Sequence, residues 1–328
     1  MARPPIDSDD FYFAEPARFW RSTSAKAAVQ VLTGSEFVQL RIPEYYDHLA
    51  LNCGRDFKNI RKVAKFIPLF LNDKPHKEIR KQLAVYLRGI SGAVQRFEDD
   101  AVALVSQLMR QVGPLDMVSE IVHPIIRDMA FKFTGLDYVD GVSEIVIGSH
   151  SLRATHKMDA AIGQILAQSE ARFPDEDEEQ RALRVVFNIL GADPLGSSMA
   201  RSFQAVMTGA EKHKISELDW RETFTATGLE FMIRECRRAP DEQSGEAICE
   251  RPVQLDMTRF LTDSGANPNH IFGVGNHACL GRGVSLNLWK RIVDDMRQNP
   301  MRVTYVKAEP SLGKIVNFPV SFQIEVLK

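Results

Sequence analysis

The sequence predicts a mainly α-helical single domain with a small β component. Several long stretches carry apolar residues at three- and four-residue spacing, which is the pattern of amphipathic helices. Alternation of apolar and polar residues, typical of strands, occurs near the C-terminus. Hydrophobic residues make up 44% of the chain and charged residues 26%, ordinary values for a soluble globular protein.

The predicted helices follow one another along most of the chain. Glu78–Val112 is helical with an interruption at Ser91-Gly92, and Met117–Phe133 is closed by Gly135 in the manner of a helix C-cap. An acidic run at Asp175–Gln180 leads into a long apolar helix. The remaining predicted helices are Arg181–Val206, Leu218–Arg238 and Leu280–Asn299, and the predicted strands are Arg302–Val306 and Val316–Val326.

Net charge and cysteine spacing limit the binding partners and the cellular compartment that we expect for this protein. The formal net charge of −2 gives no general bias toward nucleic acid or membrane surfaces. The four cysteines lack a disulfide-framework spacing, which indicates a reducing, cytoplasmic protein. No run of about 20 apolar residues would cross a bilayer. We expect one domain over residues 1–328, with the polar residues 1–10 as its candidate disordered end.

The segment Phe272–Gly281 carries the strongest chemical signal. It reads Phe-Gly-Val-Gly-Asn-His-Ala-Cys-Leu-Gly and precedes the predicted helix from Leu280. Its glycines allow a loop to approach a flat ligand closely. The positive end of a helix favours a thiolate at Cys279 over a thiol. From spacing alone, a plain glycine-rich turn with a small buried cysteine stays open.

This segment resembles the cysteine-ligand loop of the cytochrome P450 family, Phe-Gly-x-Gly-x-His-x-Cys-x-Gly, at each of its fixed positions. The resemblance implies haem b (iron protoporphyrin IX), bound as the thiolate complex of Cys279. It also implies that His277 lies near a haem propionate and that Phe272, Gly273 and Gly281 border the haem. In such a complex the thiolate pushes electron density onto the iron and favours O–O cleavage.

Other segments are similar to the family in the same order along the chain. His76 and Arg80 fit the pair that binds haem propionates at the start of the C helix, although an exposed basic pair is the alternative. Leu115–Asp137 resembles the E helix, and Phe318–Phe322 resembles the final Leu-Pro-Val strand. Glu235 and Arg238 fit the Glu-x-x-Arg pair of the K helix. Glu230 and Arg234 offer a competing register.

The sequence departs from the family at the I helix. The resemblance places Gly191 against the haem and makes Asp193 the acid of the proton relay. Both threonines of that signature are replaced, by Pro194 and Leu195, and a proline inside a helix removes a backbone donor and favours a kink. Asp193 as the N-cap of a following helix is the alternative. The stretch from Arg238 to the cysteine loop and the lid are also shorter than in the family.

Three functions remain open. The first is a monooxygenase of specialised metabolism that oxidises a small organic substrate and receives electrons from a ferredoxin-type donor at a basic surface. The second is a haem-thiolate enzyme that uses peroxide or catalyses dehydration, isomerisation or nitrogen chemistry. The third is an accessory protein that stabilises a partner enzyme, although a retained iron ligand argues against it. A zinc site at His277 and Cys279 lacks further ligands at a recognisable spacing.

Overall fold

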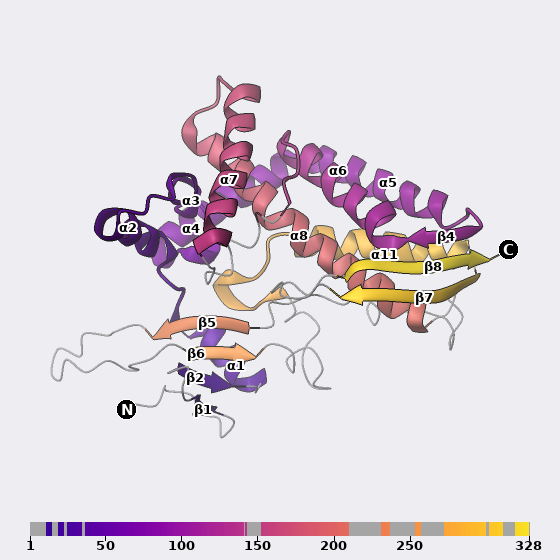
Figure 1. Ribbon diagram of the computed structural model, residues 1–328, viewed down its shortest axis with the longest axis horizontal. Helices are drawn as coiled ribbons and strands as arrows, with labels where there is room; N and C mark the ends of the chain where they lie inside the picture. The colour runs from indigo at the N-terminus through magenta and orange to yellow at the C-terminus, as the bar shows by residue number, and fades with distance from the viewer. Residues whose placement is uncertain are drawn as a thin grey trace.

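The computed structural model describes residues 11–14, 19–22, 25–34, 37–140, 142, 152–209, 231–236, 253–256, 272–299, 302–310 and 319–327. Helices dominate this part of the chain (Figure 1). The helices are α1 (Ala25–Thr33), α2 (Ile42–Cys53), α3 (Lys58–Ala64), η1 (Pro68–Phe70), α4 (Asp73–Gly89), α5 (Ser91–Leu108), η2 (Met117–Val122), α6 (His123–Thr134), α7 (Leu152–Arg172), α8 (Glu178–Gly209), η6 (Gly275–His277) and α11 (Arg282–Gln298).

Two sheets accompany the helices. A five-stranded sheet has the order β1-β2-β6-β5-β3, and a three-stranded sheet has the order β4-β8-β7. In the smaller sheet β8 lies between antiparallel neighbours, and its alternating Phe322, Ile324 and Val326 are buried. The strands are β1 (Phe11–Ala14), β2 (Phe19–Ser22), β3 (Phe37–Val38), β4 (Gly113–Asp116), β5 (Phe231–Cys236), β6 (Val253–Asp256), β7 (Arg302–Pro310) and β8 (Pro319–Leu327).

The long helix α8 runs through the centre of the helical part of the structure (Figure 1). Its 32 residues make it about 48 Å long, and it contributes to both hydrophobic cores. Its first half packs with α2, α3, α4 and α7, and its second half with α5, α6, α11 and β8. In the core around the second half of α8, the fully buried Trp289 of α11 packs edge to face against Phe203 of α8, with ring centroids 5.1 Å apart.

The helical predictions are largely confirmed. The break predicted at Ser91-Gly92 separates α4 from α5 at Ile90. Gly135 ends α6 in a left-handed conformation at φ 71°, as a C-cap requires. The long helix predicted over Arg181–Val206 is α8, and the two C-terminal strand predictions correspond to β7 and β8. Between α6 and α8 the described residues form a single long helix, α7, in keeping with a shortened lid.

Two sequence predictions are wrong. The helix predicted over Leu218–Arg238 is a strand at Phe231–Cys236, because this segment pairs with β6 on one side and β3 on the other. Pairing with distant strands overrides a local helical pattern, and aromatic and β-branched residues suit a strand. The alternative of Asp193 as an N-cap is also wrong, since α8 continues through Asp193 and Pro194. Pro194 is accommodated inside the helix at an exposed position.

Candidate functional site

The cysteine loop turns sharply in front of α11. Gly273 and Gly275 adopt φ values of 75° and 68°, in the left-handed region that favours glycine. The Cys279 amide donates to the Phe272 carbonyl at 2.7 Å, which closes the loop on itself. The Ala278 amide donates to the Gly275 carbonyl at 3.3 Å. The loop therefore presents Cys279 at a fixed place, two residues before the N-cap Gly281 of α11.

The start of α11 surrounds the Cys279 sulfur with donors. The backbone amides of Gly281 and Arg282 donate to the sulfur, and the guanidinium of Arg80 lies close enough to favour its charge. A Cβ atom on Gly281 would lie 3.7 Å from Sγ, an ordinary van der Waals contact, so Gly281 directly neighbours the sulfur.

The pKa of Cys279 differs from the sequence prediction. Burial is the largest influence and raises the pKa of the thiol above its ordinary value, against the two amides and Arg80, which lower it. The residue itself is exposed at the surface of the loop. The donors at the helix start therefore do not by themselves lower the pKa of Cys279 below its ordinary value, because burial outweighs them.

Helix α4 brings a histidine to this loop. His76 is 3% exposed, and its ring stacks on that of His277 with centroids 4.0 Å apart and an interplanar angle of 31°. Its Nε2 atom is buried and has no hydrogen-bond partner within the described part of the chain. Burial, followed by the charges of Arg80 and Lys77, lowers the pKa of His76. An orphaned ring nitrogen at this depth suits an acceptor supplied by a ligand.

Arg80 is on the same face of α4, as its spacing from His76 predicts. Its guanidinium donates to the carbonyl of Ala278, the residue before Cys279. The alternative of an exposed basic pair is therefore wrong, since His76 is buried and Arg80 is partly buried against the loop. This bond fixes the loop to α4, and the remaining guanidinium N–H groups are positioned for an anion.

Helix α1 supports the other side of the loop, which the sequence did not indicate. A Cβ atom on Gly275 would lie 3.1 Å from the carbonyl oxygen of Leu32 and 3.4 Å from the side chain of Thr33. The loop thus lies between α1 and α4, and Phe272 at its start packs against the larger core. A glycine at a tight turn was the available signal, but the partner helix is not encoded locally.

Asp193 lies on α8 in contact with a residue outside every motif. The hydroxyl of Tyr138, in the connection after α6, donates to the Asp193 carboxylate. The same hydroxyl is 3.2 Å from Asp140. Burial and these two carboxylates raise the pKa of Tyr138 far above its ordinary value. Gly191 lies against α6, where an added Cβ would meet the Met129 side chain at 2.9 Å. The predicted haem contact of Gly191 and catalytic role of Asp193 stay predictions.

The predicted Glu-x-x-Arg pair does not stand on a helix. Glu235 lies in β5, paired with Val38 of β3, so the assignment to a K helix is wrong at this residue. Arg238 lies outside the described residues. The pairing with β3 was not visible in the sequence because the partner strand is about 200 positions away.

The residues present fit a haem. An outward-facing cysteine with two amide donors, a buried histidine with an orphaned nitrogen and a partly buried arginine come from two distant segments and meet at one place. In a haem site the cysteine would supply the thiolate ligand, and the histidine and arginine would supply donors for the propionates. Within the described ranges no three His, Cys, Asp or Glu side chains gather as a metal site, so the zinc alternative gains no support.

Comparison with solved structures identifies the fold. A structure of P450BioI in complex with an acyl carrier protein ligated to hexadec-9Z-enoic acid aligns with a TM-score of 0.75 at 16% identity, over 97% of this chain and 95% of that one. A thermophilic cytochrome P450 from Sulfolobus tokodaii aligns with a TM-score of 0.66 at 14% identity, over 98% and 97%. CYP109B1 from Bacillus subtilis gives 0.65 at 12% identity, over 97% and 96%.

Sequence comparisons alone do not reach this relationship. No protein-family model matches the chain, and no curated protein matches it. None of the helices in the described residues combines the length and apolar character that crossing a membrane requires. The matching structures are all cytochromes P450 and are covered over nearly their whole length. The chain therefore has the cytochrome P450 fold.

Proposed function

We propose that the protein is a haem-thiolate oxidoreductase. It would act in the cytoplasm and oxidise a small organic molecule of specialised metabolism. The meeting of Cys279, His76 and Arg80 at one loop carries this proposal. Cys279 would ligate the iron of haem b, and His76, His277 and Arg80 would hold the propionates. When bound, a thiolate-ligated haem supplies oxidative chemistry, because the thiolate pushes electron density onto the iron.

The residues of this chain have separate tasks in that chemistry. The amides of Gly281 and Arg282 donate to the sulfur and moderate its basicity, as outer hydrogen bonds tune a metal ligand. Arg80 holds the Ala278 carbonyl and so fixes the orientation of the next residue, Cys279. Burial lowers the pKa of His76, and its Nε2 atom, which has no partner among the described residues, would hydrogen-bond a propionate.

A second candidate is a haem-thiolate enzyme that does not activate dioxygen. Pro194 and Leu195 provide no hydroxyl on α8, and the Asp193 carboxylate already accepts a hydrogen bond from Tyr138. A relay through Asp193 would include its hydrogen bond with Tyr138, and the raised pKa of that phenol disfavours proton donation by it. Peroxide is already at the reduction level that dioxygen reaches after taking up two electrons and two protons, and dehydration and isomerisation do not consume dioxygen.

The redox partner follows from the same proposal. A ferredoxin-type donor would carry acidic groups, and Lys81 and Arg88 of α4 are exposed cations on the helix that touches the cysteine loop. P450BioI was solved with an acyl carrier protein, which is also an external protein partner. A partner enzyme that completes the shortened lid is the other form that such an association would take.

The test begins with the spectrum of the reduced, carbon-monoxide-bound protein after haem loading. We expect a strongly red-shifted Soret band in the wild type and in Cys53→Ser, which removes another exposed thiol. We expect the shift to be lost in Cys279→Ser. A Soret band that is unchanged in Cys279→Ser refutes thiolate ligation, and a failure to take up haem at all leaves the accessory function.

The choice of oxidant distinguishes the monooxygenase from the second candidate. Turnover of candidate substrates is compared with dioxygen plus a reductase and with peroxide alone. Activity that requires the reductase supports the monooxygenase, whereas equal activity with peroxide and no reductant supports the second candidate.

A further inference from the structure

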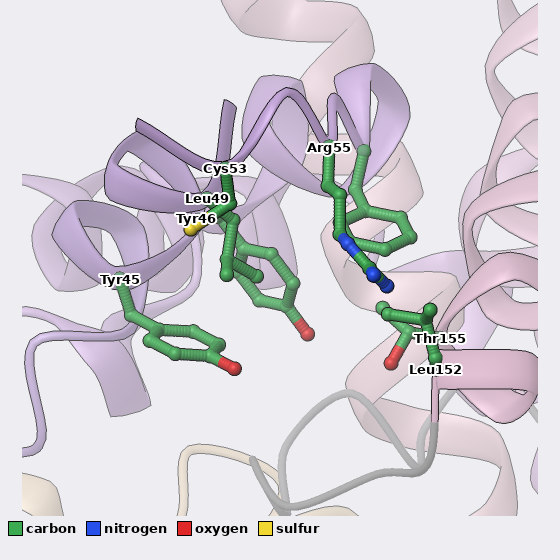
Figure 2. A pocket seen from close by; sticks show the side chains of 8 residues that line it. Tyr45, Tyr46, Leu49, Cys53, Arg55, Leu152 and Thr155 are labelled. Carbon is green, nitrogen blue, oxygen red and sulfur yellow. The ribbon is translucent and has the colours of Figure 1, made fainter. Parts of the chain in front are cut away.

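A small cavity is lined by α2, the connection from α2 to α3 and the start of α7 (Figure 2). Its volume is about 180 Å³, below the usual range for drug-sized ligands, so it suits a small molecule. No lining residue takes part in the contacts among Cys279, His76 and Arg80. The cavity is lined by Tyr45, Tyr46, Leu49, Cys53, Arg55, Phe57, Leu152 and Thr155.

The cavity holds an arginine with no counter-ion in the described part of the chain. Arg55 follows the C-cap of α2, and Figure 2 shows its guanidinium directed toward the same space as the Tyr46 and Thr155 hydroxyls. Among the described residues no carboxylate pairs with it. The nearby Arg61, in contrast, bonds to Asp47 at 2.8 Å and to Asp56 at 3.0 Å. Asp47 and Asp56 therefore bond to Arg61, and among the described residues the Arg55 guanidinium has no ion pair.

A buried phenol adds a second donor. Tyr46 is 3% exposed, and its ring packs edge to face against Tyr45 and Phe57 with centroid distances of 5.4 and 5.9 Å. Burial, with smaller effects of Tyr45 and Asp159, raises the pKa of Tyr46 to about 12. The phenol thus keeps its proton at neutral pH. Its hydroxyl has no hydrogen-bond partner among the described residues and points into the cavity (Figure 2).

The walls of the cavity are preformed. Asp159 of α7 accepts the backbone amides of Asn59 and Ile60 in the first turn of α3, both at 2.9 Å, and so joins these two helices. The side chains of Leu49, Phe57 and Leu152 give the cavity an apolar surface. An apolar wall beside two convergent donors is the usual composition of a small-molecule site.

We propose that this cavity binds a small carboxylate with an apolar body. The guanidinium of Arg55 and the hydroxyl of Tyr46 donate to the carboxylate, while Leu49, Phe57 and Leu152 contact the apolar chain. A guanidinium binds a carboxylate through charge-assisted hydrogen bonds, and the apolar lining favours a carboxylate that carries a hydrocarbon chain over inorganic phosphate. This site does not depend on the proposed haem chemistry, because it uses none of the residues that would hold the haem.

Cys53 at the edge of the cavity provides a local readout. The purified full-length chain is labelled with a maleimide, and the rate at Cys53 is measured by peptide mass spectrometry as octanoate is added. Glutathione added to the same sample is the reference thiol for non-specific effects. The variants are Arg55→Gln, Tyr46→Phe and, as a matched control, Lys58→Gln, which removes an exposed cation three residues away that does not line the cavity.

We expect octanoate to slow the labelling of Cys53 and not that of the added glutathione. Loss of a charge-assisted hydrogen bond is expected to weaken octanoate binding about tenfold in Arg55→Gln, with a smaller loss in Tyr46→Phe and none in Lys58→Gln. Arg55 is exposed, so its variant should retain the wild-type unfolding midpoint. Equal affinity in Arg55→Gln, no protection at saturating octanoate, or equal protection by 1-octanol or inorganic phosphate would overturn the proposal.

Discussion

Replacing Gly275 by alanine tests whether α1 holds the cysteine loop. At φ 68° a residue with a Cβ costs roughly 1–2 kcal/mol. The added methyl would also lie 3.1 Å from the Leu32 carbonyl oxygen, a backbone atom that cannot rotate away. We expect Gly275→Ala to lower the free energy of unfolding by about 2–3 kcal/mol in guanidinium titrations.

Substitutions at two further glycines separate the cost of the left-handed backbone from the cost of the contact with α1. Gly54 has φ 63° but open space around the added methyl, so Gly54→Ala should cost only about 1 kcal/mol. Gly283 lies in α11 with open space and no strained φ, so Gly283→Ala should stabilise the protein by about 0.5 kcal/mol. If Gly275→Ala lowers the free energy of unfolding no more than Gly54→Ala does, then the contact with α1 does not contribute to stability and the reasoning is refuted.

Three other perturbations follow from named contacts. Because burial lowers the pKa of His76, the folded state binds fewer protons than the unfolded chain; stability before haem loading should be full above about pH 6.5 and fall as the pH drops below it. His76→Gln should flatten that slope in urea titrations, and an unchanged slope contradicts the assignment. Asp159→Ala removes the acceptor at the start of α3 and should cost about 1 kcal/mol by thermal unfolding, where no change would show that the amides find other partners. Glu98, 3% exposed and 3.3 Å from Arg291, joins α5 to α11; Glu98→Ala should cost about 3 kcal/mol, and a loss below 1 kcal/mol would mean that the pair is not desolvated.

Local pattern in the sequence was sufficient for most helices. The apolar spacing of α4, α5, α6 and α8 appears because each helix buries one face, and Gly135 marks a helix end through its own backbone preference. The cysteine loop was equally readable, since its glycines occupy the left-handed turns that they suggested. The four-residue spacing of His76 and Arg80 placed both on one face without knowledge of any partner.

Contacts between distant segments decided the rest. β5 is a strand because β3 and β6 pair with it, and β3 lies almost two hundred positions earlier in the sequence. Tyr138 meets Asp193, and Arg55 faces a cavity closed by α7, only after α6, α7 and α8 have packed. The pKa of Cys279 is also raised, whereas its position at a helix start predicted that it would be lowered. A helix end is a local property, whereas desolvation is summed over all surrounding atoms, and only the tertiary structure supplies that sum.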